Sequence, residues 1–324
     1  MGKFIIDAHS HLWLKQDTQI GGKVIKSLKN GRSIFFDQEV QMIPPFMIDG
    51  KNSAEVFLSN MDYAQVGAAV VVQEIIDGNQ NAYLKEVQEK YPDRFFCMGM
   101  VDFENNDFSK AFENNDFSKA FENTKSTERN PLIQAAALYS QGFKGIAIPG
   151  HRIQGSLLSA MPMFKFMEEK GMILSMCLAE DDRQIAEMGE VIRECQNLKV
   201  AIGHFGMVTT SYFESQVKLA GLGKNVMVES GGITWLYNSE FYPFPSAVKS
   251  IRQASDWVGM DKLMWGSDYP RTITAITYKM SYDFISKTNE LTDTEKALFL
   301  GENAMRFYGF KNLPELPYIK NMSE

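Results

Sequence analysis

Two histidines one residue apart, close to the first residue, are the most chemically informative feature of the sequence. His9 and His11 follow an apolar run, Phe4 to Ile6, in the segment Asp-Ala-His-Ser-His that begins at Asp7. Alternate side chains of a β-strand lie on one face, so both imidazoles can face the same site. Two imidazoles on one face form part of a mononuclear metal site. The segment therefore predicts a metal-binding strand end.

The elements that must position these histidines alternate between strands and helices. Apolar and β-branched runs predict eight strands, at 3–7, 68–73, 95–101, 144–148, 172–178, 198–202, 225–229 and 262–265. Helices are predicted between them, at 53–65, 81–91, 131–141, 162–170, 182–195, 211–222 and 245–258, and after the last strand at 274–288 and from Thr292. This alternation predicts a (β/α)8 TIM barrel in one domain, residues 1–324. A doubly wound sheet is the alternative, but no Gly-x-Gly-x-x-Gly follows the first strand.

Two segments interrupt this alternation. Residues 14–51 form a long connection with several Gly and Pro residues, which predicts an inserted lid or subdomain. Residues 103–123 contain a nine-residue segment repeated verbatim. Nine residues make about two and a half helical turns, so the two copies cannot share one amphipathic face. We expect a loop and a short helix capped by Asp116, near or outside the barrel rim.

Composition excludes several classes of protein. The 324 residues carry a net charge of −7 without a cluster of Lys and Arg, which argues against a nucleic-acid-binding protein. No apolar run approaches the roughly 20 residues of a membrane span, and the start lacks a signal-peptide pattern. The three cysteines, Cys97, Cys177 and Cys195, are widely separated. An odd, scattered set predicts reduced thiols and a cytoplasmic location.

Polar residues follow most of the predicted strands, where the active site of such a barrel forms. All four histidines of the chain occupy these strand ends. The residues at these ends are His9, His11, Gln73, Glu74, His151, Arg152, Cys177, Glu180, His204, Glu229, Asp268 and Arg271. We expect their side chains to converge at one end of the barrel.

Five motifs give the chain a resemblance to a known family. They are Ile-Asp-Ala-His-Ser-His from Ile6, Gly-Phe-Lys-Gly-Ile from Gly142, Ile-Gly-His-Phe-Gly from Ile202, Gly-Ser-Asp-Tyr-Pro from Gly266 and Gly-Glu-Asn-Ala-Met-Arg-Phe-Tyr-Gly from Gly301. The chain resembles the amidohydrolase superfamily, in particular its amidohydrolase-related branch. That branch includes aminocarboxymuconate-semialdehyde and resorcylate-type decarboxylases, lactonases and hydratases.

The resemblance implies roles for particular residues. His9 and His11 would ligate one divalent ion, zinc before manganese. Asp268 would bind the metal or transfer a proton, and His204 would act as a general acid or base or polarise the substrate. The family usually has a further histidine at the end of strand 5, where this chain has Cys177. Cysteine can ligate zinc or be a small buried side chain, and some lactonase relatives use no metal, so all three alternatives stay open.

Other residues are candidates for contact with substrate. Arg271 could bind a carboxylate in a bidentate manner or be a solvated surface residue. His151 and Arg152 could bind an anionic substrate or stabilise their own loop. Glu74 could be a polar residue of the pocket wall or a buried partner of Arg152 or Arg271. Aromatic residues gather in two loops that could line a pocket or form a dimer interface. One loop holds Trp13, Phe35, Phe36 and Phe46, and the other holds Trp235, Tyr237, Phe241, Tyr242 and Phe244.

Together these observations predict a cytoplasmic metal-dependent hydrolase for a small cyclic or aromatic carboxylated compound. The alternatives are a non-oxidative decarboxylase of the aminocarboxymuconate or resorcylate type, a metal-independent lactonase and a catalytically inactive binding barrel. We expect a homodimer or higher homo-oligomer with a small-molecule substrate and no nucleic-acid or membrane partner.

Overall fold

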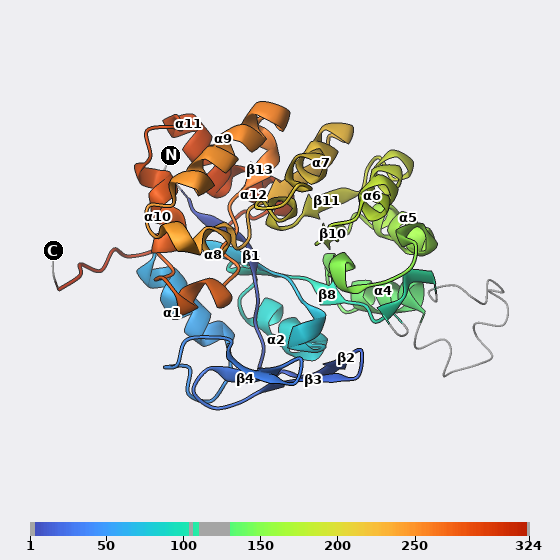
Figure 1. Ribbon diagram of the computed structural model, residues 1–324, viewed down its shortest axis with the longest axis horizontal. Helices are drawn as coiled ribbons and strands as arrows, with labels where there is room; N and C mark the ends of the chain where they lie inside the picture. The colour runs from blue at the N-terminus through green and yellow to red at the C-terminus, as the bar shows by residue number, and fades with distance from the viewer. Residues whose placement is uncertain (1–3, 104–105, 110–129, 323–324) are drawn as a thin grey trace.

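The computed structural model describes residues 4–103, 106–109 and 130–322, and its centre is a set of parallel strands surrounded by helices (Figure 1). One parallel sheet has the order β1-β6-β7 and the other has the order β13-β12-β11-β10-β9-β8. The strands are β1 (Ile6–Ser10), β6 (Ala68–Val71), β7 (Phe95–Cys97), β8 (Gly99–Met100), β9 (Gly145–Ile148), β10 (Ile173–Met176), β11 (Lys199–Ile202), β12 (Val226–Glu229) and β13 (Leu263–Met264). These strands confirm the predicted α/β alternation.

Among the described residues, strand pairing divides into two parallel sheets, so closure into one barrel stays a prediction. The third predicted strand is interrupted at Met98, which separates β7 from β8. At the other junction, individual hydrogen bonds replace a continuous ladder. The backbone N–H of Ala8 donates to the carbonyl of Trp265 at 2.9 Å, and that of Asp268 donates to the carbonyl of His9 at 2.9 Å. The strands are thus divided into two hydrogen-bonded sheets, because β13 is short and the third predicted strand breaks at Met98.

Both sheets nevertheless contribute to one interior. Alternate strand residues belong to different hydrophobic clusters: Val70 lies in the inner cluster and Val71 in the cluster that includes the helices. The inner cluster also contains Ala8 from the first sheet and Met227 and Met264 from the second. Side chains of opposite sheets therefore pack against one another.

Helices cover the outside of these sheets (Figure 1). They are α1 (Ala54–Tyr63), α2 (Asn81–Lys90), α4 (Pro131–Ser140), α5 (Met161–Glu169), α6 (Asp182–Glu194), α7 (Phe213–Lys218), α8 (Ile233–Leu236), α9 (Pro245–Val258), α10 (Met280–Lys287), α11 (Asp293–Ala297) and α12 (Asn303–Tyr308). A capping box formed by Thr292 and Glu295 begins α11, and the Asn130 side chain accepts from the N–H of Leu132 at 2.9 Å. In the described part of the chain, no helix is long and apolar enough to span a membrane.

The inserted residues 14–51 form a small antiparallel sheet of their own, at one end of the molecule (Figure 1). Its strands are β2 (Asp17–Ile20), β3 (Lys23–Ser27), β4 (Arg32–Phe35) and β5 (Gln38–Gln41). Gly21 and Gly22 both have positive φ in the first hairpin turn, which is the backbone that tight hairpins require. The insert leaves and rejoins the body at one place, where Trp13 and Asn52 exchange backbone hydrogen bonds of 3.0 and 2.9 Å.

Most of the duplicated segment, including Asp116 and its predicted helix, lies outside the described residues. In the first copy, Phe103 and Phe108 are buried, and their rings meet edge to face with centroids 4.8 Å apart. The backbone N–H of Phe108 donates to the carbonyl of Gln154 at 2.8 Å. These two phenylalanines therefore belong to the hydrophobic core.

Candidate metal centre and cavity

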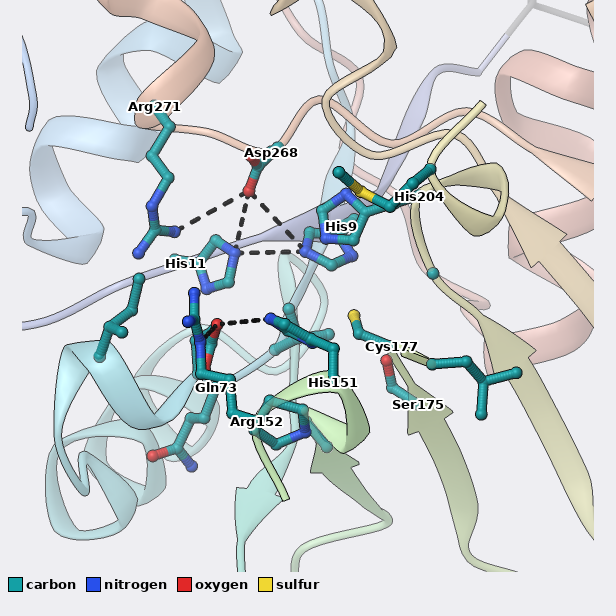
Figure 2. A pocket seen from close by; sticks show the side chains of 18 of the residues that line it. His9, His11, Gln73, His151, Arg152, Ser175, Cys177, His204, Asp268 and Arg271 are labelled. Atoms are coloured by element: carbon teal, nitrogen blue, oxygen red, sulfur yellow. Dashed lines mark hydrogen bonds and ion pairs between the residues drawn. The ribbon is translucent and has the colours of Figure 1, made fainter. Parts of the chain in front are cut away.

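His9, His11 and Asp268 converge where β1 and β13 end (Figure 2). The two Nε2 atoms of the histidines lie 3.2 Å apart. Asp268 Oδ1 lies 3.0 Å from Nε2 of His11 and 3.8 Å from Nε2 of His9. All three side chains are buried. The structure therefore brings together the three residues that the sequence singles out as metal ligands.

The outer nitrogen of each histidine faces a carboxylate. Nδ1 of His9 lies 2.7 Å from Oε1 of Glu229. Nδ1 of His11 lies 3.2 Å from Oδ2 of Asp77, but the angles do not make a hydrogen bond, and both atoms are buried without a hydrogen-bond partner among the described residues. A carboxylate at Nδ1 keeps the proton on that nitrogen and leaves the Nε2 lone pair free. Both histidines are thus oriented as metal ligands with carboxylates behind them.

The donor set itself fits a cation. With both Nδ1 atoms protonated, two nitrogen lone pairs and a carboxylate oxygen face one another, and such acceptors repel unless a positive charge lies between them. Burial alone would lower the pKa of His9, but the charges of Glu229 and Asp268 outweigh it and raise the pKa to about 9. The surroundings therefore favour positive charge, which a divalent ion would supply.

Asp268 is held in its ionised form. Burial would raise its pKa, but the hydrogen bond and charge of His11 and the charge of Arg271 hold the pKa well below its usual range. Its Oδ2 accepts a hydrogen bond of 2.8 Å from the indole N–H of Trp235. The backbone of Asp268 has a φ of 59°, in the left-handed region that Asp adopts more readily than most residues.

The Asp of the Asp-x-His-x-His segment has a structural role. Asp7 is fully buried and accepts hydrogen bonds from the backbone and hydroxyl of Ser267, from Tyr278 Oη at 2.8 Å and from the His9 backbone at 3.1 Å. It therefore joins β1, which carries the histidines, to the loop that carries Asp268.

His204 lies beside this centre, with its ring centroid 4.5 Å from that of His9. Its Nδ1 lies 2.7 Å from the carbonyl oxygen of Gly231, so Nδ1 must donate and Nε2 remains an acceptor. Burial, together with the positive charge of His9, lowers the pKa of His204. His204 is therefore a neutral imidazole with one nitrogen available to substrate or water.

Cys177 also lines the cavity, with its sulfur pointing toward His9 (Figure 2). The ligand atoms of His9, Cys177 and His204 all lie within 4.8 Å of one another. Burial, and then the negative charge of Glu229, raises the pKa of the Cys177 thiol. Cys177 is partly exposed to the cavity, whereas Cys97 and Cys195 are buried.

Glycines allow the backbone to approach the His9–Glu229 pair. A Cβ at Gly203 would lie 2.7 Å from Cys177 Sγ and 2.9 Å from Glu229 Oε1. A Cβ at Gly266 would lie 2.7 Å from that of His9. Real Cβ atoms do not come this close, so a larger residue would displace the pair. This contact gives a physical reason for glycines in the Gly-His-Phe-Gly and Gly-Ser-Asp segments.

A cavity of about 710 Å³ opens above these groups. Glu74, His151 and Arg152 form one polar wall, where Oε2 of Glu74 lies 2.5 Å from Nε of Arg152 and 3.3 Å from Nε2 of His151. Glu74 is therefore the partner of Arg152. Burial would raise the pKa of Glu74, but these two partners hold it well below its usual range.

Arg271 lines the cavity beside Asp268 and is not a solvated surface residue. Its Nη2 donates to Asp77 Oδ1 at 2.8 Å, and its Nη1 lies 3.9 Å from Asp268 Oδ1. Trp13 differs from the expectation of substrate contact, because it is fully buried and is not among the residues that line the cavity. Its ring centroid lies 5.7 Å from the Arg271 guanidinium, so Trp13 supports this arginine from behind.

The inserted sheet supplies an apolar wall of the cavity, through Phe35, Val40 and Met42. Sequence reasoning placed Glu229 among the strand-end residues and Trp235 in an aromatic loop without giving either a partner, and it did not single out Asp77. Glu229 ends β12, so the strand-end rule that selected the other residues also points to it. Asp77 ends a short 3-10 helix, Ile75–Asp77, and Trp235 lies in α8, and no sequence signal connects either residue to its partner.

Comparisons with known proteins agree with this geometry. A family model described as amidohydrolase matches residues 6–310. No curated protein matches the chain. Among solved structures, a probable 2-pyrone-4,6-dicarboxylic acid hydrolase from Acinetobacter baumannii, with citric acid bound, is 17% identical; the match covers 94% of this chain and 99% of that one, with a TM-score of 0.62.

Two further solved structures contain metal. An amidohydrolase from Burkholderia multivorans with bound zinc is 15% identical; the match covers 96% of this chain and 100% of that one, with a TM-score of 0.62. A 5-carboxyvanillate decarboxylase from Novosphingobium aromaticivorans with bound manganese is 17% identical. The match covers 79% of this chain and 81% of that one, with a TM-score of 0.51. These structures share the fold, and the family model spans nearly the whole sequence, so this chain is an enzyme that belongs to the amidohydrolase family.

Proposed function

We propose that this protein is a metal-dependent hydrolase that acts on a small cyclic or aromatic carboxylated compound. The observation that carries the proposal is the convergence of His9 Nε2, His11 Nε2 and Asp268 Oδ1, with a carboxylate behind each histidine. Zinc is the first choice of metal and manganese the second, in line with the metals bound in the two similar structures. The inner cluster shared by both sheets supports a single (β/α)8 barrel domain.

The residues around the centre supply the remaining chemistry. When bound, a divalent cation provides Lewis acidity toward a substrate oxygen or water. Asp268 is ionised and anchored by Trp235, so it can accept the proton that water loses on attack. His204 presents a neutral Nε2, which can accept a hydrogen bond or take up a proton during the reaction.

The cavity walls suit a ring that carries a carboxylate. Phe35, Val40 and Met42 offer apolar surface to a flat ring, while Arg152 and Arg271 offer guanidinium groups to its carboxylate. Glu74 balances the positive charge of Arg152, and Asp77 balances that of Arg271, so both arginines are held in place without substrate. Names of the similar structures, a pyrone dicarboxylic acid hydrolase and a carboxyvanillate decarboxylase, point to the same class of compound.

Two other reactions remain candidates on this fold. Non-oxidative decarboxylation is favoured by the similarity to a decarboxylase structure. Metal-independent lactone hydrolysis is favoured by Cys177, which stands where a histidine ligand is usual. The three reactions differ in metal requirement and in whether CO2 is released.

The test combines metal analysis with product analysis. Protein purified without added metal is assayed for bound zinc and manganese, alongside His9→Ala, whose folding is checked by circular dichroism. Both proteins then receive cyclic lactones and aromatic carboxylates, with and without chelator, and acid and CO2 release are measured. Metal-dependent acid release without CO2 supports the proposal. Stoichiometric CO2 identifies a decarboxylase, and undiminished hydrolysis in metal-free protein refutes metal dependence.

We further propose a cytoplasmic homo-oligomer. All three cysteines are free, as expected of a reducing compartment. The aromatic loops divide between two roles: Phe35 and Trp235 line the cavity, whereas Phe46 and Phe241 are exposed, with 68% and 59% of their surface accessible. Exposed aromatics are enriched at subunit interfaces. Light scattering of the purified protein tests this proposal, and a monomeric mass at micromolar concentration would contradict it.

A further inference from the structure

The inserted region directs one polar side chain toward the metal centre. Gln16 lies just before β2 and is fully buried, although its neighbours Lys15 and Asp17 are exposed. Its Nε2 donates to Oδ1 of Asp77 at 2.8 Å. Asp77 belongs to the body of the protein and ends the short 3-10 helix that follows β6. Gln16 therefore connects the insert directly to the carboxylate behind His11.

The insert holds the Gln16 amide from the other side. Oε1 of Gln16 accepts from the hydroxyl of Ser33, in β4, at 3.0 Å. The backbone N–H of Gln16 donates to Oγ of Ser27, in β3, at 3.0 Å, and the N–H of Ser27 donates to the carbonyl of Gln16 at 2.9 Å. A side-chain amide has one acceptor oxygen and one donor nitrogen. Since Ser33 takes the oxygen, the nitrogen faces Asp77.

The hydrogen bonds at Asp77 leave one of its carboxylate oxygens for His11. Oδ1 accepts from Gln16 and also from Nη2 of Arg271, at 2.8 Å in each case. Oδ2 has no hydrogen-bond partner among the described residues and lies 3.2 Å from Nδ1 of His11. Because a carboxylate is planar, the two donors on Oδ1 determine the direction in which Oδ2 points.

We propose that Gln16 is a positioning residue through which the inserted sheet controls metal affinity, because it holds the Asp77 carboxylate against His11. This inference rests on the proposed metal-dependent function. A carboxylate behind a ligating histidine fixes the tautomer and the orientation of the ring, so the group that holds this carboxylate affects the ligand as well. Phe35, Val40 and Met42 of the same insert line the cavity. The insert thus contributes to the cavity wall and to the support of the metal centre.

Zinc affinity, measured by competition with a chromophoric chelator, tests this proposal without an activity assay. In Gln16→Met the side chain keeps its length but cannot donate. We expect zinc to bind about 3–10-fold more weakly, a smaller effect than the roughly 10–100-fold cost of losing a direct partner of a ligating histidine. Ile25→Val is the matched control, because Ile25 is a fully buried apolar residue of the same insert. It should lower stability, since a buried methylene is removed, and leave zinc affinity unchanged.

A double-mutant cycle separates action through Asp77 from a general structural role. In an Asp77→Asn background, Gln16→Met should weaken zinc binding by less than about twofold, because the carboxylate that it holds is already absent. Losses that simply add would overturn the role of Gln16, and so would an equal loss of affinity in Ile25→Val. The single variants decide the question even where Asp77→Asn does not fold.

Two outcomes distinguish this inference from the proposed function. Unchanged zinc affinity in a folded Gln16→Met protein would overturn the role of Gln16 and leave the metal centre intact. Failure of wild type to bind zinc or manganese would overturn both proposals. Gln16→Asn, whose amide is one methylene shorter, replaces Gln16→Met if that variant does not fold, and the same loss of affinity is expected.

Discussion

Replacing Glu229 by glutamine tests whether the carboxylate behind His9 controls the metal centre. Three donors converge on this carboxylate: Nδ1 of His9 at 2.7 Å, the backbone N–H of His204 at 3.1 Å and the backbone N–H of Gly231. Glutamine has the same shape, but one of its two terminal atoms is a donor. Whichever way the amide turns, an N–H group faces another N–H group.

The expected size of the effect follows from these contacts. Loss of a partner that orients a metal-ligating histidine costs on the order of 10–100-fold in metal affinity, or about 1.4–2.8 kcal/mol. In addition, a buried N–H left without its acceptor costs about 1–3 kcal/mol of folding free energy. Glu229→Gln should therefore bind zinc 10–100-fold more weakly and unfold at a lower denaturant concentration.

Competition with a chromophoric chelator measures the zinc affinity, and urea denaturation of metal-free protein measures the stability. Glu290→Gln is the matched control, because Glu290 is exposed and lies in the segment between α10 and α11. A folded Glu229→Gln protein with the zinc affinity of wild type would refute the reasoning, since the carboxylate would then not act through His9.

Four further predictions follow from the same geometry. Gly203→Ala places a Cβ against Cys177 Sγ, so we expect about 1–3 kcal/mol lower stability and a lower zinc content by elemental analysis. Asp7→Asn loses a carboxylate that accepts four hydrogen bonds, and urea denaturation should show a loss of about 1.5–3 kcal/mol, whereas an unchanged midpoint would contradict its structural role. Since the pKa of Glu74 is lowered in the folded state, its stabilisation is present above the unfolded-state pKa of 4.5 and is lost as pH falls below it. In Glu74→Gln, Arg152 has no carboxylate partner at any pH. As pH falls below 4.5, the free energy of unfolding of this variant should therefore decrease less than that of wild type, as measured by denaturation at each pH. Zinc at one hundred times its dissociation constant should stabilise metal-free protein by about 2.7 kcal/mol, a shift in Tm that calorimetry detects and that chelator reverses.

The sequence predicted the order of the strands and helices well, because strands buried on both faces, such as β6 and β9, consist of uninterrupted apolar residues. It did not predict the break at Met98 or the brevity of β13, because hydrogen-bond pairing depends on sheet curvature and not on residue type. Residues 14–51 were expected to be an inserted region, but their four-stranded sheet depends on hairpin pairing that breaker residues alone do not specify.

Candidate site residues were predictable where topology alone determines position. His9 lies near the end of β1, and His11, His204 and Asp268 come after parallel strands, whose carboxyl ends meet at one edge of the sheet. The interaction between His11 and Asp77 depends on the path of a turn, which no local pattern specifies. Trp13 lies behind Arg271 and not on the cavity wall, because membership of an aromatic loop does not show which way a side chain faces.

The inserted sheet supplies part of the cavity wall but none of the proposed metal ligands. All the groups proposed to perform chemistry come from strand ends of the body, whereas part of the cavity wall comes from a segment closed off by the Trp13–Asn52 bridge. Substitutions of Phe35, Val40 and Met42 can reshape the wall without touching a proposed metal ligand, whereas Gln16 must stay because it donates to Asp77, the carboxylate behind His11, at 2.8 Å. Substrate range can therefore diverge while the reaction stays the same, and exchange of the cavity-facing residues Phe35, Val40 and Met42 offers a route to altered selectivity.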